Sequence, residues 1–339
     1  MMRLPPFDFM RPSTLAEAVE LKAKYGSEAM YVSGGTDLYP KMKRRQFTPG
    51  VLISLNKIDG LQAFSNGDGM TIGAGLTLAD IAGQPDIKRK YPALAHAAGL
   101  VSSPPLRNVG TIGGNLCVDT RCTYYDQTYQ WRKSLGFCLK KAGDTCWVAL
   151  SSPKCLAVTS SDCAPVAIAL GARIHLVGPA GERTVPVAAL YANDGKDYLL
   201  KSPDEILVSI QLPSRDGWRM AYWKMRRRGS IDFPILGVAV ALQLDDGGIC
   251  TAARIVLGAV SSQPIAADEA ASKLVGHKIT PELVQEVAQG AYRLAKPLDN
   301  TDMALSYRNK MSRIYVAGAL SEAAGIPFSV YRSSNAGAG

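Results

Sequence analysis

The chain has 339 residues, more than one ordinary hydrophobic core organises, so we expect two domains. Its composition, 47% hydrophobic and 20% charged residues, is typical of a globular protein and excludes a disordered or fibrous one. No apolar run reaches the roughly 18 residues that a membrane-spanning helix needs. The N-terminal sequence MMRLPPFDFM has a proline pair and an acid where a signal peptide needs an apolar stretch. These features predict a cytoplasmic protein without a membrane span.

The formal net charge of +9 raises the question of a nucleic-acid partner. A nucleic-acid binder usually concentrates basic and aromatic residues on one face that carries a motif. Here the basic residues are scattered, apart from KMKRR at 41–45 and KMRRR at 224–228, and neither run lies in such a motif. We therefore expect no nucleic-acid partner, and we favour surface solvation or small-anion binding over a polyanion groove.

In chain order, the hydrophobic periodicity first predicts mixed helices and strands. Residues 13–26 begin with a Ser-Thr cap and end at a glycine, as a helix does. Residues 29–33 and 50–55 are short apolar runs typical of buried strands. By the same criteria we predict further strands at 70–75, 173–178 and 204–213, and further helices at 77–84, 91–101 and 162–172.

The hydrophobic pattern changes near residue 216, where we place the boundary between the two domains. Residues 219–229 and 236–260 alternate as strands do, around an Asp-Asp-Gly-Gly turn that is a hairpin signal. Three helices are predicted after the hairpin, at 264–275, 281–295 and 308–324. The predicted domains are 1–216, with subdomains of about 1–57 and 58–216, then a smaller α+β domain at 217–326, then a disordered tail at 327–339.

Two glycine-containing segments are suited to binding phosphate. SGGTDL at 33–38 directly follows a predicted strand, and TIGGN at 111–115 has the same construction. Consecutive glycines let successive backbone N–H groups converge on an anion. Neither segment is a G-x-G-x-x-G fingerprint or a P-loop. A single Gly-Gly segment is usually only a turn, but two in one domain indicate a ligand with two phosphates, such as a dinucleotide.

With these loops the sequence resembles the FAD-binding subunits of molybdenum hydroxylases, the family of xanthine dehydrogenase and carbon monoxide dehydrogenase. The similarity extends to SSDCAP at 160–165 and YWKMRRR at 222–228, and it spans residues 3–325. It implies an α+β fold, in which an FAD-binding domain of the PCMH (vanillyl-alcohol-oxidase-like) type precedes a C-terminal domain resembling that of the carbon monoxide dehydrogenase flavoprotein. By this resemblance the expected FAD contacts are Val32, Ser33, Gly34, Gly35, Thr36, Asp37, Leu38, Ser102, Thr111, Ile112, Gly113, Gly114, Asn115, Thr123, Asp162 and Lys224.

The resemblance also assigns parts of FAD to some of these residues. Both glycine loops would bind the pyrophosphate, and Asp162 would lie near the adenosine or ribose. Lys224 would lie close to the isoalloxazine, where a cation favours the anionic reduced form. The alternative for Lys224 is an ordinary surface lysine on a strand.

Four of the seven cysteines, Cys122, Cys138, Cys146 and Cys155, fall within 35 residues. In a reducing compartment clustered cysteines are metal ligands or redox groups more often than disulfides. Four thiolates are what a [4Fe–4S] cluster needs, one for each iron. The spacing is too open for the C-x₂-C pairs of a zinc ribbon or a bacterial ferredoxin. Spacing alone therefore leaves ordinary buried cysteines as an equal alternative.

The stretch from NLCVDTRCT to SSPKC also resembles the additional segment in the flavin subunits of 4-hydroxybenzoyl-CoA reductases. This resemblance implies that residues 117–158 are an insertion whose four cysteines ligate a [4Fe–4S] cluster. The remaining cysteines, 117, 163 and 250, are expected to be ordinary small residues. Basic residues outnumber acids by six to two within 121–155. That excess fits either a docking surface for an acidic ferredoxin, with Lys140 and Lys141 as contacts, or a solvated loop face.

No motif in the chain indicates substrate chemistry, so we assign no catalytic residue. The resemblance implies an oxidoreductase subunit that works with a large molybdopterin-binding subunit and a small [2Fe–2S] subunit. Electrons would pass from ferredoxin through the cluster and FAD to molybdenum, where 4-hydroxybenzoyl-CoA is reductively dehydroxylated to benzoyl-CoA. Two alternatives stay open: the flavin subunit of a related molybdenum hydroxylase for another aromatic or N-heterocyclic substrate, and a stand-alone flavin and cluster redox protein.

Overall fold

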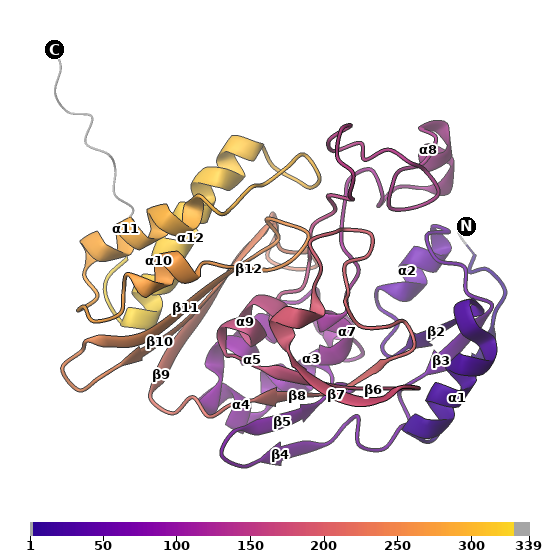
Figure 1. Cartoon of the computed structure of the whole chain (residues 1–339), viewed down its shortest axis with the longest axis horizontal. Helices are drawn as coiled ribbons and strands as arrows, with labels where there is room; N and C mark the ends of the chain where they lie inside the picture. Colours follow the sequence, from indigo (N-terminus) through magenta and orange to yellow (C-terminus); the bar gives the residue numbers. More distant parts are fainter. Residues whose placement is uncertain (1–2, 329–339) are drawn as a thin grey trace.

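The structure, a computed structural model, describes residues 3–328. Its N-terminal part is a three-stranded parallel sheet of order β1-β3-β2, at the right of Figure 1. The Thr14 side chain caps the first helix by accepting a hydrogen bond from the Glu17 N–H. The elements of this part are β1 (Asp8–Met10), α1 (Leu15–Tyr25), a 3-10 turn (Gly26–Glu28), β2 (Ala29–Val32), α2 (Leu38–Lys43) and β3 (Val51–Ser54).

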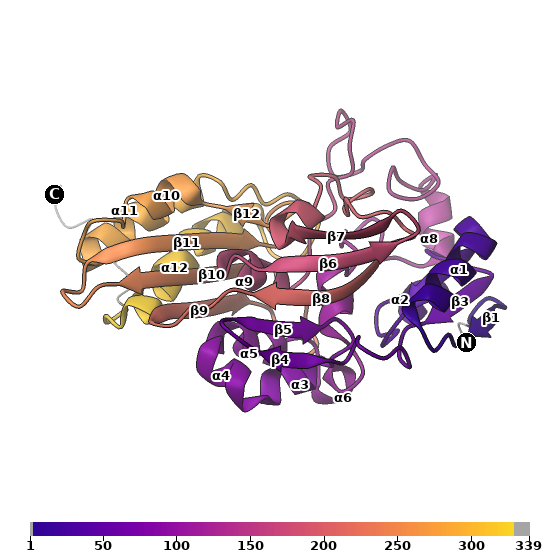
Figure 2. The same cartoon turned by 60° about the horizontal axis from the view of Figure 1, so that its bottom comes forward.

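The middle part is a five-stranded antiparallel sheet of order β4-β5-β8-β6-β7. Ile72, Ile210 and Ile174 face one another across β5, β8 and β6 and are at most 2% exposed, so helices cover this face (Figure 2). The strands are β4 (Phe64–Asn66), β5 (Met70–Gly73), β6 (Arg173–Gly178), β7 (Gly181–Pro186) and β8 (Ile206–Leu212). The helices are α3 (Leu78–Gly83), α4 (Pro85–Lys90), α5 (Pro92–Gly99), α6 (Pro104–Arg107), α7 (Ile112–Leu116), α9 (Cys163–Ala169) and a 3-10 turn (Val187–Leu190).

The C-terminal part is a four-stranded antiparallel sheet of order β12-β11-β10-β9 with three helices against one face. Its elements are β9 (Trp218–Met225), β10 (Leu236–Leu244), β11 (Cys250–Gly258), β12 (Ile265–Ala266), α10 (Asp268–Ser272), α11 (Pro281–Tyr292) and α12 (Leu305–Ala324). Among the helices within residues 3–328, none is both long enough and apolar enough to cross a bilayer.

Strand β10 is buried on both faces, which determines how the C-terminal part is attached. Val238, Val240 and Leu242 pack in the core formed with α10, α11 and α12. Ala239 and Ala241 belong instead to the core of the middle part, where α5 and α9 lie. Alternate residues of a strand point to opposite faces, so helices from both parts cover the four-stranded sheet.

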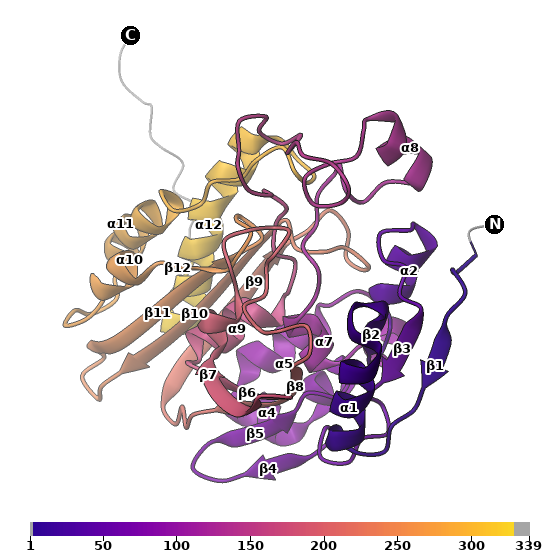
Figure 3. The ribbon, with the colours of Figure 1, turned by 45° about the vertical axis from the view of Figure 1, so that its right-hand side comes forward.

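Residues 117–158 form an irregular lobe between α7 and α9, with a single short helix, α8 (Tyr129–Ser134). Figures 1 and 3 show this lobe at the top of the molecule, beside α2 and the loop before α12. The Gln46 side chain donates to the Tyr125 carbonyl at 2.7 Å, and the Asn300 side chain donates to the Leu156 carbonyl at 2.6 Å. The lobe is therefore fastened to the body on two sides despite its lack of regular structure.

The predicted hairpin around 245–248 is confirmed by β10 and β11, and the predicted strand at 173–178 coincides with β6. The helix predicted at 264–275 is wrong in its first part. Ile265 and Ala266 extend the sheet as β12, and the helix begins only at Asp268. Most of the tail predicted to be disordered, from residue 329 onward, lies outside the described residues.

Candidate functional site

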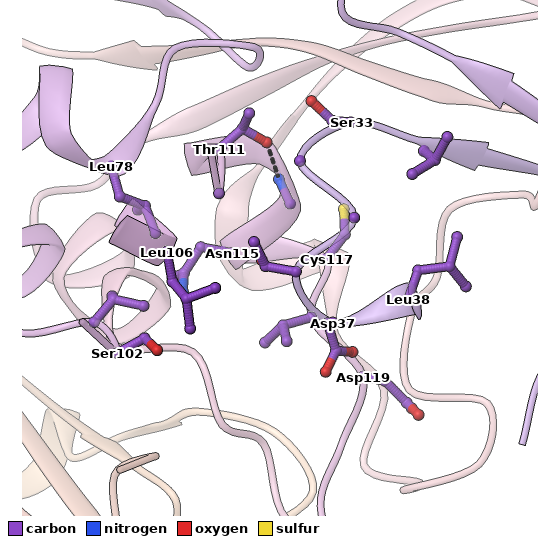
Figure 4. A pocket seen from close by; sticks show the side chains of 18 of the residues that line it. Ser33, Asp37, Leu38, Leu78, Ser102, Leu106, Thr111, Asn115, Cys117 and Asp119 are labelled. Atoms are coloured by element: carbon purple, nitrogen blue, oxygen red, sulfur yellow. Dashed lines mark hydrogen bonds between the residues drawn. The ribbon is translucent and has the colours of Figure 1, made fainter. Parts of the chain in front are cut away.

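The first glycine loop, residues 33–38, joins β2 to α2 (Figure 4). In the described chain, residues 3–328, the backbone N–H groups of residues 34–37 donate no hydrogen bond to another protein atom. Gly35 has a φ of +68°, a left-handed conformation that glycine adopts without strain. Successive N–H groups left free by such a turn form a concave anion site.

The second glycine loop is built differently, because its N–H groups are already used. Thr111 caps α7, and its side chain accepts the Gly114 N–H at 3.1 Å, the dashed line in Figure 4. The Gly113 N–H donates to the Ala74 carbonyl at 2.9 Å. A Cβ atom on Gly113 would lie 2.7 Å from the Ala74 Cβ, so this glycine permits close packing. The sequence suggested the same construction for both loops, and the hydrogen bonds correct that suggestion.

A cleft lies between the two loops, and a second cleft adjoins it. Tyr198 and Cys117 line both clefts, so the two form a continuous site along the loops. The exposed ring of Phe233, from the loop between β9 and β10, also lines the first cleft. Of the predicted FAD contacts, those that line the first cleft are Val32, Ser33, Gly34, Gly35, Thr36, Asp37, Leu38, Ser102, Thr111, Gly114 and Asn115.

Five predicted contacts lie elsewhere. Gly113 lines only the second cleft, and the Ile112 side chain is buried in the core of the middle part. The Thr123 N–H donates to the Asn300 carbonyl at 2.9 Å, on the side where the lobe meets the C-terminal part. Asp162 and Lys224 line neither cleft.

Asp162 and Lys224 form a buried ion pair. The Lys224 Nζ lies 2.8 Å from Asp162 Oδ2, and their side chains are 1% and 2% exposed. The Tyr222 hydroxyl donates to the other carboxylate oxygen at 2.8 Å. Burial raises the pKa of Asp162 above its ordinary value, while the ammonium opposes this change. Because their side chains contact each other, the two residues cannot lie at opposite ends of FAD, and their roles as FAD contacts stay predictions.

We expect the Lys224→Met variant to lose stability. Removing one partner of a buried pair leaves an uncompensated charge, and the typical cost is about 3–5 kcal/mol of unfolding free energy. Denaturant unfolding of the purified chain measures the change. Lys273→Met is the matched control, because Lys273 forms an exposed pair with Glu286 and its loss should change little. Equal unfolding curves for the two variants would contradict the structural role of the buried pair.

The four clustered cysteines converge on one small cavity in the lobe. Cys122, Cys138, Cys146 and Cys155 all line it, and each is 5–7% exposed. All four are free thiols rather than disulfides. The rest of the lining is one basic residue, Lys140, and the aromatic and apolar residues Tyr124, Tyr125, Leu139, Trp147, Val148 and Ala157.

The pKa values of these thiols bear on whether the cavity could bind a metal. Burial raises the pKa of Cys122 to about 12 and that of Cys155 to about 11. The Lys140 ammonium, which also lines the cavity, opposes the rise at Cys155 without outweighing burial. A metal would therefore have to displace protons from these thiols. Within residues 3–328, no group of three or more His, Cys, Asp or Glu side chains is arranged to hold a metal ion. A cluster differs from a single ion in taking one thiolate for each iron.

A chain of ion pairs joins the first glycine loop to the lobe. Asp37 pairs with Arg121, the residue immediately before the first of the four cysteines. Arg121 also lies 3.2 Å from Asp126, and Lys41 of α2 pairs with Asp119. Sequence reasoning missed every member except Asp37. The Asp-Thr-Arg-Cys run did contain two of them, but their partners lie about 80 residues away in the chain.

The structure also corrects the expected docking contact at Lys140. Its side chain is only 5% exposed, and its Nζ donates to Asp119 at 2.7 Å and to the Thr120 hydroxyl at 2.6 Å. An ammonium held inside the lobe cannot contact another protein, whereas Lys141 is half-buried.

The comparisons with known proteins agree with this architecture. Residues 5–215 match the FAD binding domain in molybdopterin dehydrogenase, and residues 220–323 match the CO dehydrogenase flavoprotein C-terminal domain. The carbon monoxide dehydrogenase medium chain of Hydrogenophaga pseudoflava is 29% identical over 321 residues, covering 94% of this chain and 97% of the relative. The aldehyde oxidoreductase FAD-binding subunit PaoB of Escherichia coli is 32% identical over 274 residues, covering 76% and 82%.

Among solved structures, CO dehydrogenase from Oligotropha carboxidovorans has a TM-score of 0.79 at 27% identity, over 96% of this chain and 100% of that one. The match to an FAD binding domain and the relatives of the chain define an FAD-binding subunit of an oxidoreductase, and the cleft between the glycine loops is consistent with it. The chain belongs to the FAD-binding medium subunits of the molybdenum hydroxylase family. The family expected from the sequence is thereby confirmed.

Proposed function

We propose that this chain binds both FAD and a [4Fe–4S] cluster, and that it transfers electrons within a molybdenum enzyme that resembles 4-hydroxybenzoyl-CoA reductase. The observation that carries the proposal is the convergence of four buried cysteine thiols on one cavity. The ion pair between Asp37 and Arg121 links this cavity to the glycine loop.

The first glycine loop fits the diphosphate of FAD. Its free N–H groups at residues 34–37 would donate to phosphate oxygens, and Gly34 leaves room for the segment that precedes the second loop. The second loop would shape the cleft through its packing rather than through its backbone donors. Phe233 and Leu106 are exposed residues of the cleft lining and would shield the bound ring system from water.

The cysteine cavity fits a [4Fe–4S] cluster in the number and softness of its donors. Cys122, Cys138, Cys146 and Cys155 would each ligate one iron as a thiolate, and Trp147 and Tyr125 would exclude water. When bound, such a cluster exchanges single electrons. The two sites in one chain would let electrons enter at the lobe and reach the flavin.

The proposed substrate and partners rest on the resemblance of residues 117–158 to the additional segment of 4-hydroxybenzoyl-CoA reductases. The relatives include a carbon monoxide dehydrogenase medium chain, an aldehyde oxidoreductase subunit and a nicotinate dehydrogenase FAD-subunit, and none of these names mentions an iron–sulfur centre in the chain.

We propose partner subunits that carry molybdopterin and [2Fe–2S] clusters and hold the active site, with reduced ferredoxin as the electron donor. The reaction would be reductive dehydroxylation of 4-hydroxybenzoyl-CoA to benzoyl-CoA. The second candidate, favoured by the names of the relatives, is a hydroxylase-type reaction on another aromatic or N-heterocyclic substrate.

Anoxic purification of the complex tests the proposal. We expect this chain, once separated from its partners, to contain about four iron and four acid-labile sulfides for each FAD. The intact complex should form benzoyl-CoA from 4-hydroxybenzoyl-CoA when a reduced viologen dye supplies electrons. A chain with full FAD and no iron would contradict the cluster assignment. A chain with its cluster but a complex inert toward this substrate would favour the second candidate.

A further inference from the structure

Helix α8 of the lobe carries an arginine in an unusual environment. Arg132 is 2% exposed and is among the largest fully buried side chains of the described chain. One guanidinium nitrogen donates to the Arg44 carbonyl at 2.7 Å, and the Nε has no hydrogen-bond partner. Within residues 3–328, no carboxylate oxygen lies within 4.0 Å of this guanidinium. Burial of a cation without a negatively charged partner is normally disfavoured.

The surroundings of Arg132 do not supply the missing negative charge. The rings of Tyr129 and Phe137 have their centroids 6.0 Å from the guanidinium carbon. The negative charge of Asp126 attracts the Arg132 guanidinium from beyond 4.0 Å, but that carboxylate already pairs with Arg121 at 3.2 Å. The remaining groups whose charge could act on Arg132 are the phenols of Tyr125 and Tyr129 and the Cys138 thiol, all uncharged when protonated.

Arg132 lies on the side of the cavity where Cys138 enters it. The Phe137 N–H donates to the Arg132 carbonyl at 2.7 Å, which places the end of α8 directly against the residue before Cys138. The Phe137 carbonyl in turn accepts the Trp147 indole N–H at 2.5 Å, so this residue is held by a side chain of the cavity lining as well. These bonds hold the backbone of α8 next to Cys138, and the hydrogen bond to the Arg44 carbonyl holds the guanidinium itself.

We propose that Arg132 is the counter-ion of the negatively charged cluster–thiolate unit in the lobe and raises its reduction potential. This inference rests on the proposed function, because it requires a cluster at the four cysteines. Four thiolates outweigh the positive charge of the iron–sulfur core, and each added electron makes the unit more negative. A fixed cation in a water-poor site stabilises the more negative, reduced form most. The charge that Arg132 lacks in the protein alone would then be supplied by the bound unit.

A purely structural role is the competing explanation. By binding the Arg44 carbonyl, Arg132 also stabilises the C-terminal end of α2. The two roles differ in what they require of the side chain: the structural one needs only a hydrogen-bond donor, whereas the electrostatic one needs a charge. Arg132→Gln keeps a donor without the charge, and Arg132→Lys keeps both.

The test is an EPR-monitored redox titration of the anoxic complex, with dithionite as reductant, on Arg132→Gln and Arg132→Lys. We expect the ratio of reduced to oxidised cluster at a fixed potential to fall about tenfold in Arg132→Gln, a shift of about 59 mV for one electron. Arg132→Lys should stay close to the parent. Lys133→Gln removes a neighbouring exposed charge that solvent screens, and it should cause no shift. An unchanged potential in Arg132→Gln, or equal shifts in Arg132→Gln and Lys133→Gln, would overturn the inference.

A second measurement decides the case in which Arg132→Gln fails to retain the cluster. In a Cys155→Ser background, where no cluster forms, Arg132 is a buried cation without a counter-ion. Adding Arg132→Gln should then raise the midpoint of thermal unfolding, whereas a structural role predicts that it lowers the midpoint, and that result would also overturn the inference. If the parent chain itself contains no iron, the proposed function fails, and this outcome is visible before any Arg132 variant is made.

Discussion

Replacing Gly34 with alanine is expected to weaken FAD binding by about 100-fold. An added Cβ would lie 2.7 Å from the carbonyl carbon of Val109 and 2.9 Å from the Cα of Gly110. Both atoms belong to the backbone that leads into the second glycine loop, so no side-chain rotation relieves the overlap. Forcing backbone into a strained arrangement costs about 1–3 kcal/mol at each residue, and about 2.7 kcal/mol corresponds to a 100-fold change in Kd.

The measurement is the flavin content of the purified chain, followed by titration of the apoprotein with FAD. Gly67→Ala is the matched control, since Gly67 lies in the turn between β4 and β5 and an added Cβ meets nothing within 4 Å. That variant should bind FAD as the parent does. Normal FAD affinity in Gly34→Ala would mean that the two glycine loops do not need their close approach, and it would remove the main support for this binding mode.

The elements that the sequence predicted well are those whose pattern is set by burial. Strand β6 was predicted at its observed limits because buried and less buried residues alternate along it, whereas β1, β4 and β7 were missed. β1 and β4 have three residues each, and β7 is a largely exposed edge strand, GERTVP. Such strands are stabilised by hydrogen bonds to a neighbouring strand, and a single sequence carries little trace of that neighbour.

In the site, too, features set by local sequence were predicted, and contacts between distant segments were not. Glycine pairs identified both loops, because close backbone approach requires glycine wherever it occurs. Which N–H groups stay free could not be predicted, because the Ala74 carbonyl that occupies the Gly113 N–H comes from another segment. For the same reason the contact between Asp162 and Lys224, 62 residues apart, could not be predicted from each residue separately.

In the lobe, the structure decides a question that the sequence left open, namely whether the four cysteines meet. The spacing of its cysteines left ordinary buried residues as an equal alternative, since nothing local required them to meet. The structure brings all four to one cavity, and it adds Arg132 and the pair of Asp37 with Arg121, which no sequence motif indicated. Convergence from four separated positions is harder to explain by packing than a single buried thiol is.

Replacing Cys138 with serine is expected to remove nearly all the iron and acid-labile sulfide of this chain while FAD stays bound. A serine hydroxyl is a poor substitute for a soft thiolate ligand, and a cluster with three thiolates is readily lost. Cys138 lines the cavity of the lobe, whereas the free N–H groups that would hold the diphosphate lie in the loop at residues 33–38. Metal binding contributes to folding free energy, so the lobe of this variant should also become more sensitive to proteolysis.

Iron and sulfide analysis, EPR of the dithionite-reduced sample and limited proteolysis provide the measurements. Cys250→Ser makes the same chemical change at another buried cysteine, at the start of β11, where the thiol contacts the Ala252 carbonyl at 3.4 Å. We expect that control to keep its iron, because Cys250 lies in the core of the C-terminal part, outside the lobe. If Cys138→Ser and Cys250→Ser hold equal amounts of iron, the four cysteines do not act as a ligand set. The lobe would then be only a packed insertion, and electrons would need another route to the flavin.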